Sequence, residues 1–247
     1  RIFRNEGMDN RHNPEFTTIE LYQAYADFND MMDLFEDLLS SAAQKILGTY
    51  QVEWQGEQID LTPGWPRLPM YEAVKQHTGL DFLAIDSDEE AVAAAKSIGV
   101  ELPDTADKTW GNALYEVFDQ RVEGRLIQPT FITMHPVDVS PLAKRSPKDP
   151  RLTERFELFI CRSEMGNAFS ELNDPIDQRQ RFQKQVELRA KGDDEAGMMD
   201  EDFLTALEYG LPPTGGMGIG IDRCVMLLTN NDSIREVLLF PTMKPLD

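Results

Sequence analysis

The sequence predicts an α+β fold in which helices flank an antiparallel β-sheet. Two apolar periodicities occur: some segments alternate every second residue, as strands do, and others repeat every three to four residues, as helices do. Strands and helices do not follow one another as repeated βαβ units, which disfavours a doubly wound parallel sheet. With 247 residues, 41% of them hydrophobic, the chain can form one large domain or two small ones.

The first elements form a predicted hairpin. Residues 2–6 and 16–25 alternate like strands, and the polar residues between them predict a loop. Because side chains alternate between the two faces of a strand, Glu20 and Tyr22 are expected to share one face. The hairpin therefore carries a high density of charge on one side.

A long helix is predicted over residues 29–47, with Asn29 as its N-cap and Gly48 at its end. Residues 81–108 are acidic and alanine-rich, which predicts a small helical insertion on the surface. The other predicted elements are helices at 69–77, 87–97 and 110–122, a buried strand at 129–134, a loop at 141–150, a hairpin of strands 155–161 and 165–172, helices at 177–190 and 200–209, and a glycine-rich strand at 215–220 that leads into a helix near residue 222.

Charge and composition argue against several classes of protein. The net charge of −20 is unfavourable for a surface that grips phosphate backbones without specificity, so DNA is not an expected partner. No apolar run approaches the ~20 residues that span a bilayer, and no secretory signal opens the chain. We therefore expect a cytoplasmic protein with no membrane partner. Cys161 and Cys224 lack metal-type spacing and are expected to be reduced.

The glycine-rich run at residues 215–220 fits neither the dinucleotide pattern G-x-G-x-x-G nor the P-loop pattern. Glycines 216, 218 and 220 fall on one strand face, where the absence of side chains would let a flat ring or a ligand backbone lie against the sheet. Close packing of the strand against a helix explains the run equally well. Arg223 follows at the start of a helix, where it could stack on a ring or fork onto a phosphate.

Two carboxylates lie on the arms of the second predicted hairpin. Glu157 and Glu164 would need a cation if they come close together, and hard oxygen ligands suit Mg²⁺ with phosphate oxygens and water. A solvated surface carboxylate is the commoner role, but apolar residues surround Glu157 in the sequence. A loop histidine such as His12 is, by itself, more often a surface residue than a catalytic one.

Three long segments resemble the class II aminoacyl-tRNA synthetases, in the form typical of the lysine-specific enzymes. FRNEGMDNRHNPEFTTIELYQAY is similar to motif 2, ERFELFICRSEMGNAFSELNDP is similar to a signature between motifs 2 and 3, and GLPPTGGMGIGIDRCVMLLTNNDSIREVLLFPTMKP is similar to motif 3. They span the chain in the family's order. The resemblance implies a partial catalytic domain over residues 1–247, with motif 2 at about 1–26, a helical insertion at about 81–108, a metal and lysine-pocket hairpin at 155–172, and motif 3 at about 210–245.

The resemblance also implies a reaction and its partners. ATP would activate L-lysine to lysyl-adenylate, Mg²⁺ would accompany the ATP, and the lysyl group would pass to tRNA(Lys) in a homodimeric full-length enzyme. The family's N-terminal anticodon-binding OB-fold and motif 1 are absent from the chain. So is the upstream acidic residue that binds the lysine α-amino group. We therefore expect the 247-residue chain alone to be weak or inactive.

The family's roles are carried over residue by residue. For ATP, the matching residues are Arg4 on the α-phosphate and the lysine carboxylate, Glu6 on the adenine amino group, His12 and Asn13 on the γ-phosphate and ribose side, Phe16 under the adenine, and Arg223 on its other face, with Gly220 nearby. Glu157 and Glu164 match the magnesium ligands. The residues that match the family's lysine-binding residues are Arg4, Glu20, Tyr22, Asn167, Phe169, Glu171 and Gly218. Arg4 and Arg223 are thereby the expected catalytic residues.

Two alternatives stay open at this stage. Paralogues on the same scaffold lysylate a protein side chain and also lack the anticodon domain. A synthetase fragment could also serve as a binding module without catalysis, although the matching set of ATP and metal residues disfavours this.

Overall fold

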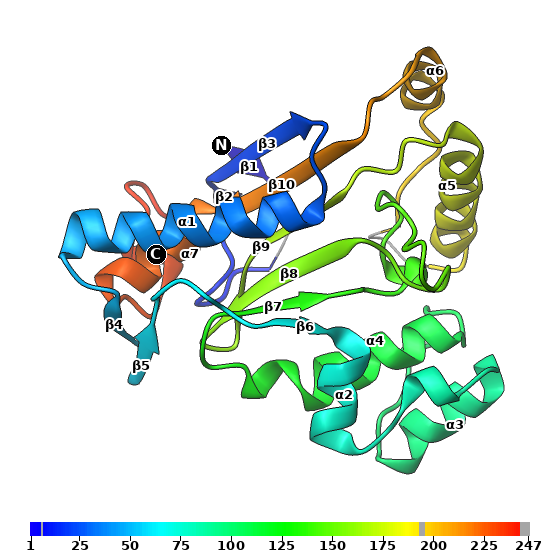
Figure 1. The fold of residues 1–247 in the computed structure, drawn as a ribbon, viewed down its shortest axis with the longest axis horizontal. Helices are drawn as coiled ribbons and strands as arrows, with labels where there is room; N and C mark the ends of the chain where they lie inside the picture. The colour runs from blue at the N-terminus through cyan, green and yellow to red at the C-terminus, as the bar shows by residue number, and fades with distance from the viewer. Residues whose placement is uncertain (6, 193–195, 243–247) are drawn as a thin grey trace, which may run out of the picture.

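The computed structural model describes residues 1–5, 7–192 and 196–242, and a six-stranded sheet organises them (Figure 1). Neighbouring strands in the sheet run antiparallel except for one parallel pair, β6 with β7. In spatial order the strands are β3 (Thr18–Ala24), β10 (Thr214–Gly220), β9 (Ser163–Ser170), β8 (Arg155–Ile160), β7 (Thr130–Thr133) and β6 (Arg67–Pro69). The predicted α+β class is confirmed.

The parallel edge of the sheet was not predicted. Strand β6 has only three residues and ends in Pro69, so no alternation marks it in the sequence. Two small antiparallel pairs accompany the main sheet: β1 (Ile2–Phe3) with β2 (Glu15–Phe16), and β4 (Gln51–Trp54) with β5 (Glu57–Asp60). The first is a much shorter form of the hairpin expected between residues 2–6 and 16–25, because most of the second segment is β3, which pairs with β10 instead. The second pair was not expected.

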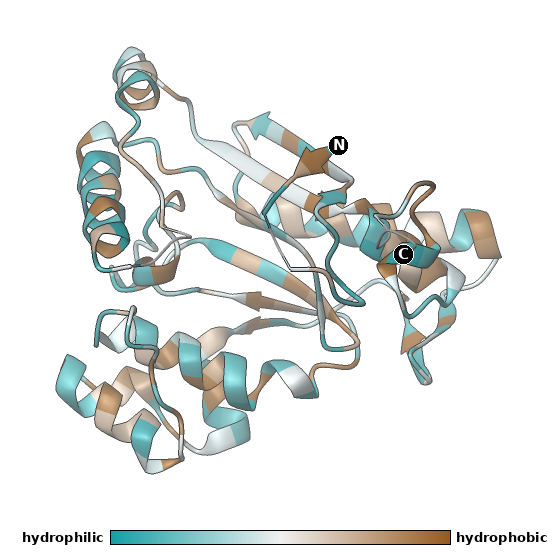
Figure 2. Cartoon of the chain, turned by 180° about the vertical axis from the view of Figure 1, so that it is seen from behind, coloured by the Kyte–Doolittle hydropathy of each residue, from teal (hydrophilic) through white to brown (hydrophobic). Residues whose placement is uncertain are grey.

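Helices cover the sheet on opposite faces (Figure 1). Helix α1 (Phe28–Leu47) packs against β9 and β10 and belongs to one apolar core. Helices α2 (Met70–Thr78), α3 (Asp88–Ser97) and α4 (Trp110–Arg121) form a second core with β6 and β7. The remaining helices are α5 (Pro175–Ala190), α6 (Glu201–Tyr209) and α7 (Ile221–Thr229), with short 3₁₀ turns η1 (Phe82–Ala84), η2 (Glu123–Arg125), η3 (Val137–Val139) and η4 (Ile234–Glu236). Hydrophilic residues dominate the surface of α5 (Figure 2).

The N-cap of helix α1 lies two residues earlier than expected. Asp27, not Asn29, is the N-cap, because its carboxylate accepts hydrogen bonds from the Asn29 and Asp30 backbone N–H groups while Asp30 bonds back to the Asp27 N–H. Gly48 ends the helix as predicted, at a φ of 73° that favours glycine. The other predicted helices lie within three residues of their expected bounds.

The segment 81–108 is not only a surface feature. It holds η1 and α3, and Ala91 and Ala95 of α3 are fully buried against α4. The alanines permit this close helix contact because they present no bulk. That the segment is an insertion relative to other proteins stays a prediction.

The hairpin of β8 and β9 is tighter than predicted. Its turn has two residues, Cys161 and Arg162, at φ values of 48° and 63°, instead of the longer gap expected around residues 162–164. Two positive φ values are typical of the type I′ turn, whose usual Asn-Gly signal is missing here. Glu164 consequently lies within β9 and not in a turn.

The two cysteines, Cys161 and Cys224, are both buried, and neither forms a disulfide. No helix in the described part of the chain is long and apolar enough to cross a membrane.

Candidate active site

A cavity of about 520 Å³ opens on the sheet face opposite α1, over β3, β10 and β9. Most of the residues expected from the sequence line it: Arg4, His12, Asn13, Phe16, Glu20, Tyr22, Glu164, Asn167, Phe169, Glu171, Gly218, Gly220 and Arg223. Glu157 does not line the cavity, because it is buried beside it. Glu6 lies outside the described residues.

Strand β10 forms the floor of the cavity because its inward positions are glycines. Gly216 lies between Tyr22 of β3 and Phe169 of β9, and Gly218 lies between Glu20 and Asn167 in the next row. Side chains on the two outer strands therefore rise as walls, while the central strand leaves open space.

The glycine run also serves close packing, but on the other face. A Cβ on Gly215 would lie 2.9 Å from the Asp27 carbonyl oxygen and 3.0 Å from Met31 Cγ, both at the start of α1. The two explanations left open by the sequence thus apply to different glycines. Gly215 permits the contact with α1, and the even-numbered glycines face the cavity.

One half of the cavity is lined by arginine side chains and aromatic rings. The Arg4 guanidinium lies 5.4 Å from the centre of the Phe16 ring, and Arg223 donates to the Glu164 carbonyl oxygen at 2.6 Å. The Arg223 Nη2 is also 3.2 Å from His12 Nε2. These contacts bring residues from the first and last quarters of the chain to one place.

The loop that holds His12 depends on Asp9, which was not singled out from the sequence. The Asp9 carboxylate accepts from the backbone N–H groups of Arg11 and His12 and contacts His12 Nδ1 at 2.9 Å. The side-chain hydrogen bond from His12 is the main cause that lowers the pKa of Asp9 to about 2. With Nδ1 donating to Asp9, neutral His12 has Nε2 free to accept from Arg223.

Arg223 is placed by the junction of β10 and α7. Its neighbour Asp222 is buried and accepts from the Thr17 backbone N–H at 2.6 Å, while the Ile221 N–H donates to the Thr17 carbonyl oxygen. These bonds tie the first turn of α7 to the chain just before β3. Asp222 was another residue that the sequence patterns did not single out.

Glu157 and Glu164 share one face of the sheet because of a β-bulge. Gly166 pairs with Leu158, but Glu164 pairs with Phe159, so Met165 is an extra residue in β9. Without the bulge, Glu164 would point to the α1 side with Gly166. The shift turns it to the same side as Glu157.

The two carboxylates differ in their surroundings. Burial alone would raise the pKa of Glu157, but Arg155 at 2.6 Å and His135 at 3.4 Å outweigh it and hold that pKa below its usual range. Burial, and next the negative charge of Glu157, raise the pKa of Glu164. Glu164 is therefore the more easily protonated of the two carboxylates.

The other half of the cavity is acidic. Burial raises the pKa of Glu171 to about 7. No cation in residues 1–5, 7–192 or 196–242 forms an ion pair with this carboxylate that would offset the effect. Burial also raises the pKa of Tyr22, with smaller effects from the charges of Glu171 and Glu20. Glu20 and Tyr22 are exposed and form the rim.

Comparison with known proteins shows the family to which the chain is similar. The family model described as tRNA synthetases class II (D, K and N) matches residues 1–244. The chain is 60% identical over 245 residues to the lysine–tRNA ligase of Pelotomaculum thermopropionicum, 59% identical over 244 residues to that of Staphylococcus haemolyticus, and 58% identical over 245 residues to that of Syntrophomonas wolfei. Each match covers 99% of this chain, but 48% or 49% of the relative.

The chain thus spans about half the length of the curated relatives it matches. The three segments that resemble motif 2, the intervening signature and motif 3 all lie within the matched range, apart from the last residue of the third. The chain belongs to the class II tRNA synthetase family of the D, K and N type.

Proposed function

We propose that the protein carrying this chain activates L-lysine with ATP and transfers the lysyl group to tRNA(Lys) in the cytoplasm. The observation that carries the proposal is the half-buried carboxylate of Glu171, which faces the cavity without a cationic partner in the described part of the chain. A carboxylate partly withdrawn from water in this way is stabilised by a ligand cation. The lysine ammonium supplies one.

The acidic half of the cavity also favours lysine over aspartate and asparagine, the other two amino acids that the family's enzymes use. Aspartate would bring a second carboxylate towards Glu171 and Glu20, and asparagine would leave Glu171 without a countercharge. The ε-ammonium of lysine can instead bond to Glu171 and Glu20, with the Tyr22 hydroxyl as a further acceptor.

For the reaction, the carboxylate oxygen of lysine attacks the α-phosphorus of ATP. A bond forms between that oxygen and phosphorus, the bond to the bridging oxygen breaks, and pyrophosphate leaves with the electron pair. No general base is required, because the nucleophile is already ionised. Arg4 and Arg223 are the residues that we assign to neutralising the phosphate charge as it develops.

Glu157 and Glu164 are the residues that we assign to Mg²⁺. No three His, Cys, Asp or Glu side chains of the described residues form a metal site by themselves. Two carboxylates on one face suit an ion that completes its shell with phosphate oxygens and water. Burial raises the pKa of Glu164 most, and the negative charge of Glu157 raises it further. A divalent cation would relieve this second effect, the repulsion between the two carboxylates. Such an ion would supply charge neutralisation at the phosphates.

Replacing Glu171 with Gln is expected to weaken lysine binding and to leave ATP binding nearly unchanged. The amide can still accept a hydrogen bond, but it loses the charge-assisted bond to the ammonium, which is worth roughly 1.5–3 kcal/mol. Titration calorimetry of the variant with each substrate measures this. Unchanged lysine affinity would remove Glu171 from the amino-acid pocket.

Lysine binding is also expected to depend on pH through Glu171. Its pKa is raised to about 7, and an ammonium beside it stabilises the carboxylate and lowers that pKa. The complex therefore holds fewer protons than the free protein between the two pKa values, so binding releases protons and affinity falls as the pH drops below about 7.

Calorimetry in two buffers with different ionisation enthalpies, between about pH 6 and 8, measures the protons released. The Glu171→Gln variant is the control, because its side chain cannot titrate. Proton release that persists unchanged in that variant would assign the pH dependence to another group.

The transfer step is tested with the complete polypeptide that carries this chain. Radiolabelled lysine is expected to appear on a tRNA(Lys) transcript and not on a protein acceptor. Labelling of protein side chains in place of tRNA would favour the paralogous ligase instead. We also propose that the enzyme acts as a homodimer, which sedimentation of the same protein measures.

A further inference from the structure

Arg155 lies at the start of β8, outside the lining of the cavity, and contacts several groups besides Glu157. Its side chain is 15% exposed. Nε donates to Asn167 Oδ1 at 2.9 Å, and Nη2 donates to Glu157 Oε1 at 2.6 Å. Nη1 donates to the Val139 carbonyl oxygen at 2.5 Å and to Ser140 Oγ at 3.0 Å. One guanidinium therefore holds groups that belong to different parts of the site.

The bond to Asn167 decides which end of the amide faces the cavity. A guanidinium has only donors, so the amide must turn its oxygen to Arg155. The Asn167 NH₂ group is then the end available to a ligand, and it can only donate. It suits an acceptor such as a carboxylate or phosphate oxygen, and it does not suit the lysine ammonium.

The bond to Glu157 fixes the second group. Glu157 Oε1 is taken by Arg155, and Oε2 lies 3.4 Å from His135 Nε2, a fully buried nitrogen that forms no hydrogen bond with the described residues. Arg155 therefore holds the carboxylate by a hydrogen bond, and His135 lies beside its other oxygen. The position of the carboxylate relative to Glu164 on the neighbouring strand follows from this support and from the bulge in β9.

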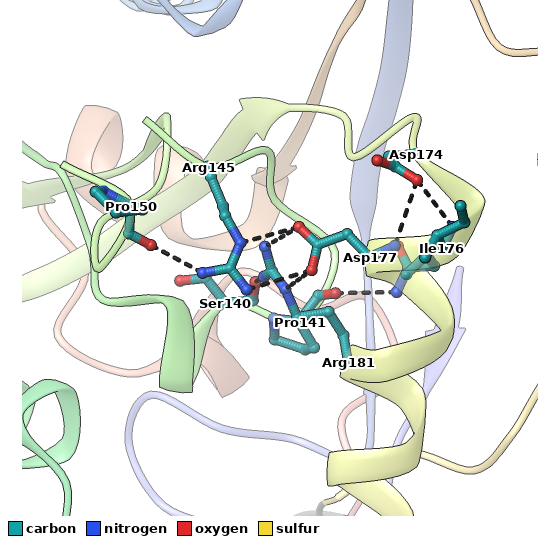
Figure 3. A network of polar contacts seen from close by, with 9 residues as sticks. Ser140, Pro141, Arg145, Pro150, Asp174, Ile176, Asp177 and Arg181 are labelled. Carbon is teal, nitrogen blue, oxygen red and sulfur yellow. Dashed lines mark hydrogen bonds and ion pairs between the residues drawn. The ribbon is translucent and has the colours of Figure 1, made fainter. Parts of the chain in front are cut away.

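Arg155 is itself anchored by the segment at η3, which is in turn bonded to helix α5. The Ser140 carbonyl oxygen accepts from Arg181 Nη1 at 2.9 Å, and Arg181 pairs with Asp177, which also binds Arg145 (Figure 3). This network fixes the segment after η3 to helix α5. The acceptors at Val139 and Ser140 therefore hold the Arg155 head group in one orientation.

We propose that Arg155 is a positioning residue that couples the amino-acid half of the cavity to its metal half. It turns the Asn167 NH₂ towards the lysine carboxylate or the α-phosphate and holds Glu157 for the cation. If Arg155 is replaced by a lysine residue, the positive charge is kept, but the single ammonium group cannot reach the acceptors at Asn167, Glu157 and the backbone together. This inference rests on the proposed function.

The test uses pyrophosphate exchange by the complete protein with Arg155→Lys, against wild type and the matched surface control Arg179→Lys. We expect Arg155→Lys to raise both the KM for lysine and the Mg²⁺ concentration for half-maximal rate about 10- to 100-fold, as for other residues that orient ligand-binding groups. Arg179, which pairs with Glu201 on the surface, should leave both values unchanged when replaced by lysine.

A double-mutant cycle separates positioning from a general structural role. In an Asn167→Ala background, Arg155→Lys should raise the KM for lysine much less than in the wild type, while the Mg²⁺ effect remains. Equal effects in both backgrounds, or a lowered melting temperature with unchanged KM values, would overturn the proposal. If wild type fails to exchange with lysine, the proposed function itself is wrong.

A second variant keeps the inference testable if Arg155→Lys does not fold. Asn167→Asp retains the pairing with Arg155 and removes the NH₂ donor, so it should fold and raise the KM for lysine at least about tenfold. A wild-type KM in Asn167→Asp would contradict the proposed orientation of the amide.

Discussion

Substituting Gly216 with alanine is expected to lower kcat/KM for lysine by about 10²-fold or more. A Cβ at this position would lie 1.9 Å from Glu171 Oε1 and 2.9 Å from Tyr22 Cε1, so the carboxylate must leave its place in the cavity. The collision involves the group that we assign to the lysine ammonium. Steady-state exchange kinetics with lysine varied at saturating ATP measure the effect, and the KM for ATP should change little.

The control is the same substitution at a glycine with free space around it. A Cβ on Gly124 meets no atom within 4 Å, and its φ is not in the left-handed range. Gly124→Ala should therefore behave as wild type. If Gly216→Ala also keeps the wild-type kcat/KM for lysine, Glu171 does not need its present position, and the pocket is assigned wrongly.

Substituting Arg223 with alanine is expected to lower kcat by roughly 10²–10³-fold, the usual effect of removing one preorganised donor from a developing charge. Its guanidinium is held by the Glu164 carbonyl oxygen and lies against His12, so it is fixed before the substrate arrives. The KM for lysine should stay close to wild type, because we assign Arg223 to ATP and not to the amino acid.

Arg179→Ala is the matched control for Arg223→Ala, since it removes an arginine of similar size from a surface ion pair. Its kcat should equal that of wild type. A wild-type kcat in Arg223→Ala would instead exclude this residue from the chemical step. Thermal unfolding of each variant shows whether the loss of rate arises from the fold.

Much of the fold could be predicted because its signals are local. Helix α1 is predicted from its apolar spacing and from Gly48 at its end, and strand β10 is predicted from its glycine-rich composition. Strand β6 could not be found, since three residues ending in Pro69 carry no period. The type I′ turn at Cys161 and Arg162 lacks the residues that usually mark such a turn.

Some residues of the candidate site could likewise be predicted from the sequence, and others could not. Residues with unusual chemistry in a recognisable string, such as Arg223 and Glu171, could be picked out directly. Asp222 and Arg155 act through bonds to other segments of the chain, and these partners are visible only once the strands are in register. Asp9 acts locally, on the Arg11 and His12 backbone, but no residue pattern marks it as part of the site. The same holds for the bulge at Met165, which no composition signals but which turns Glu164 to the face of Glu157.

The central claim is that the cavity selects lysine and activates it with ATP. ATP–pyrophosphate exchange by the complete protein, run in parallel with lysine, aspartate and asparagine, tests it most directly. We predict Mg²⁺-dependent exchange with lysine and no exchange above background with the other two amino acids. Exchange driven by aspartate or asparagine, or no exchange with lysine, would contradict the account.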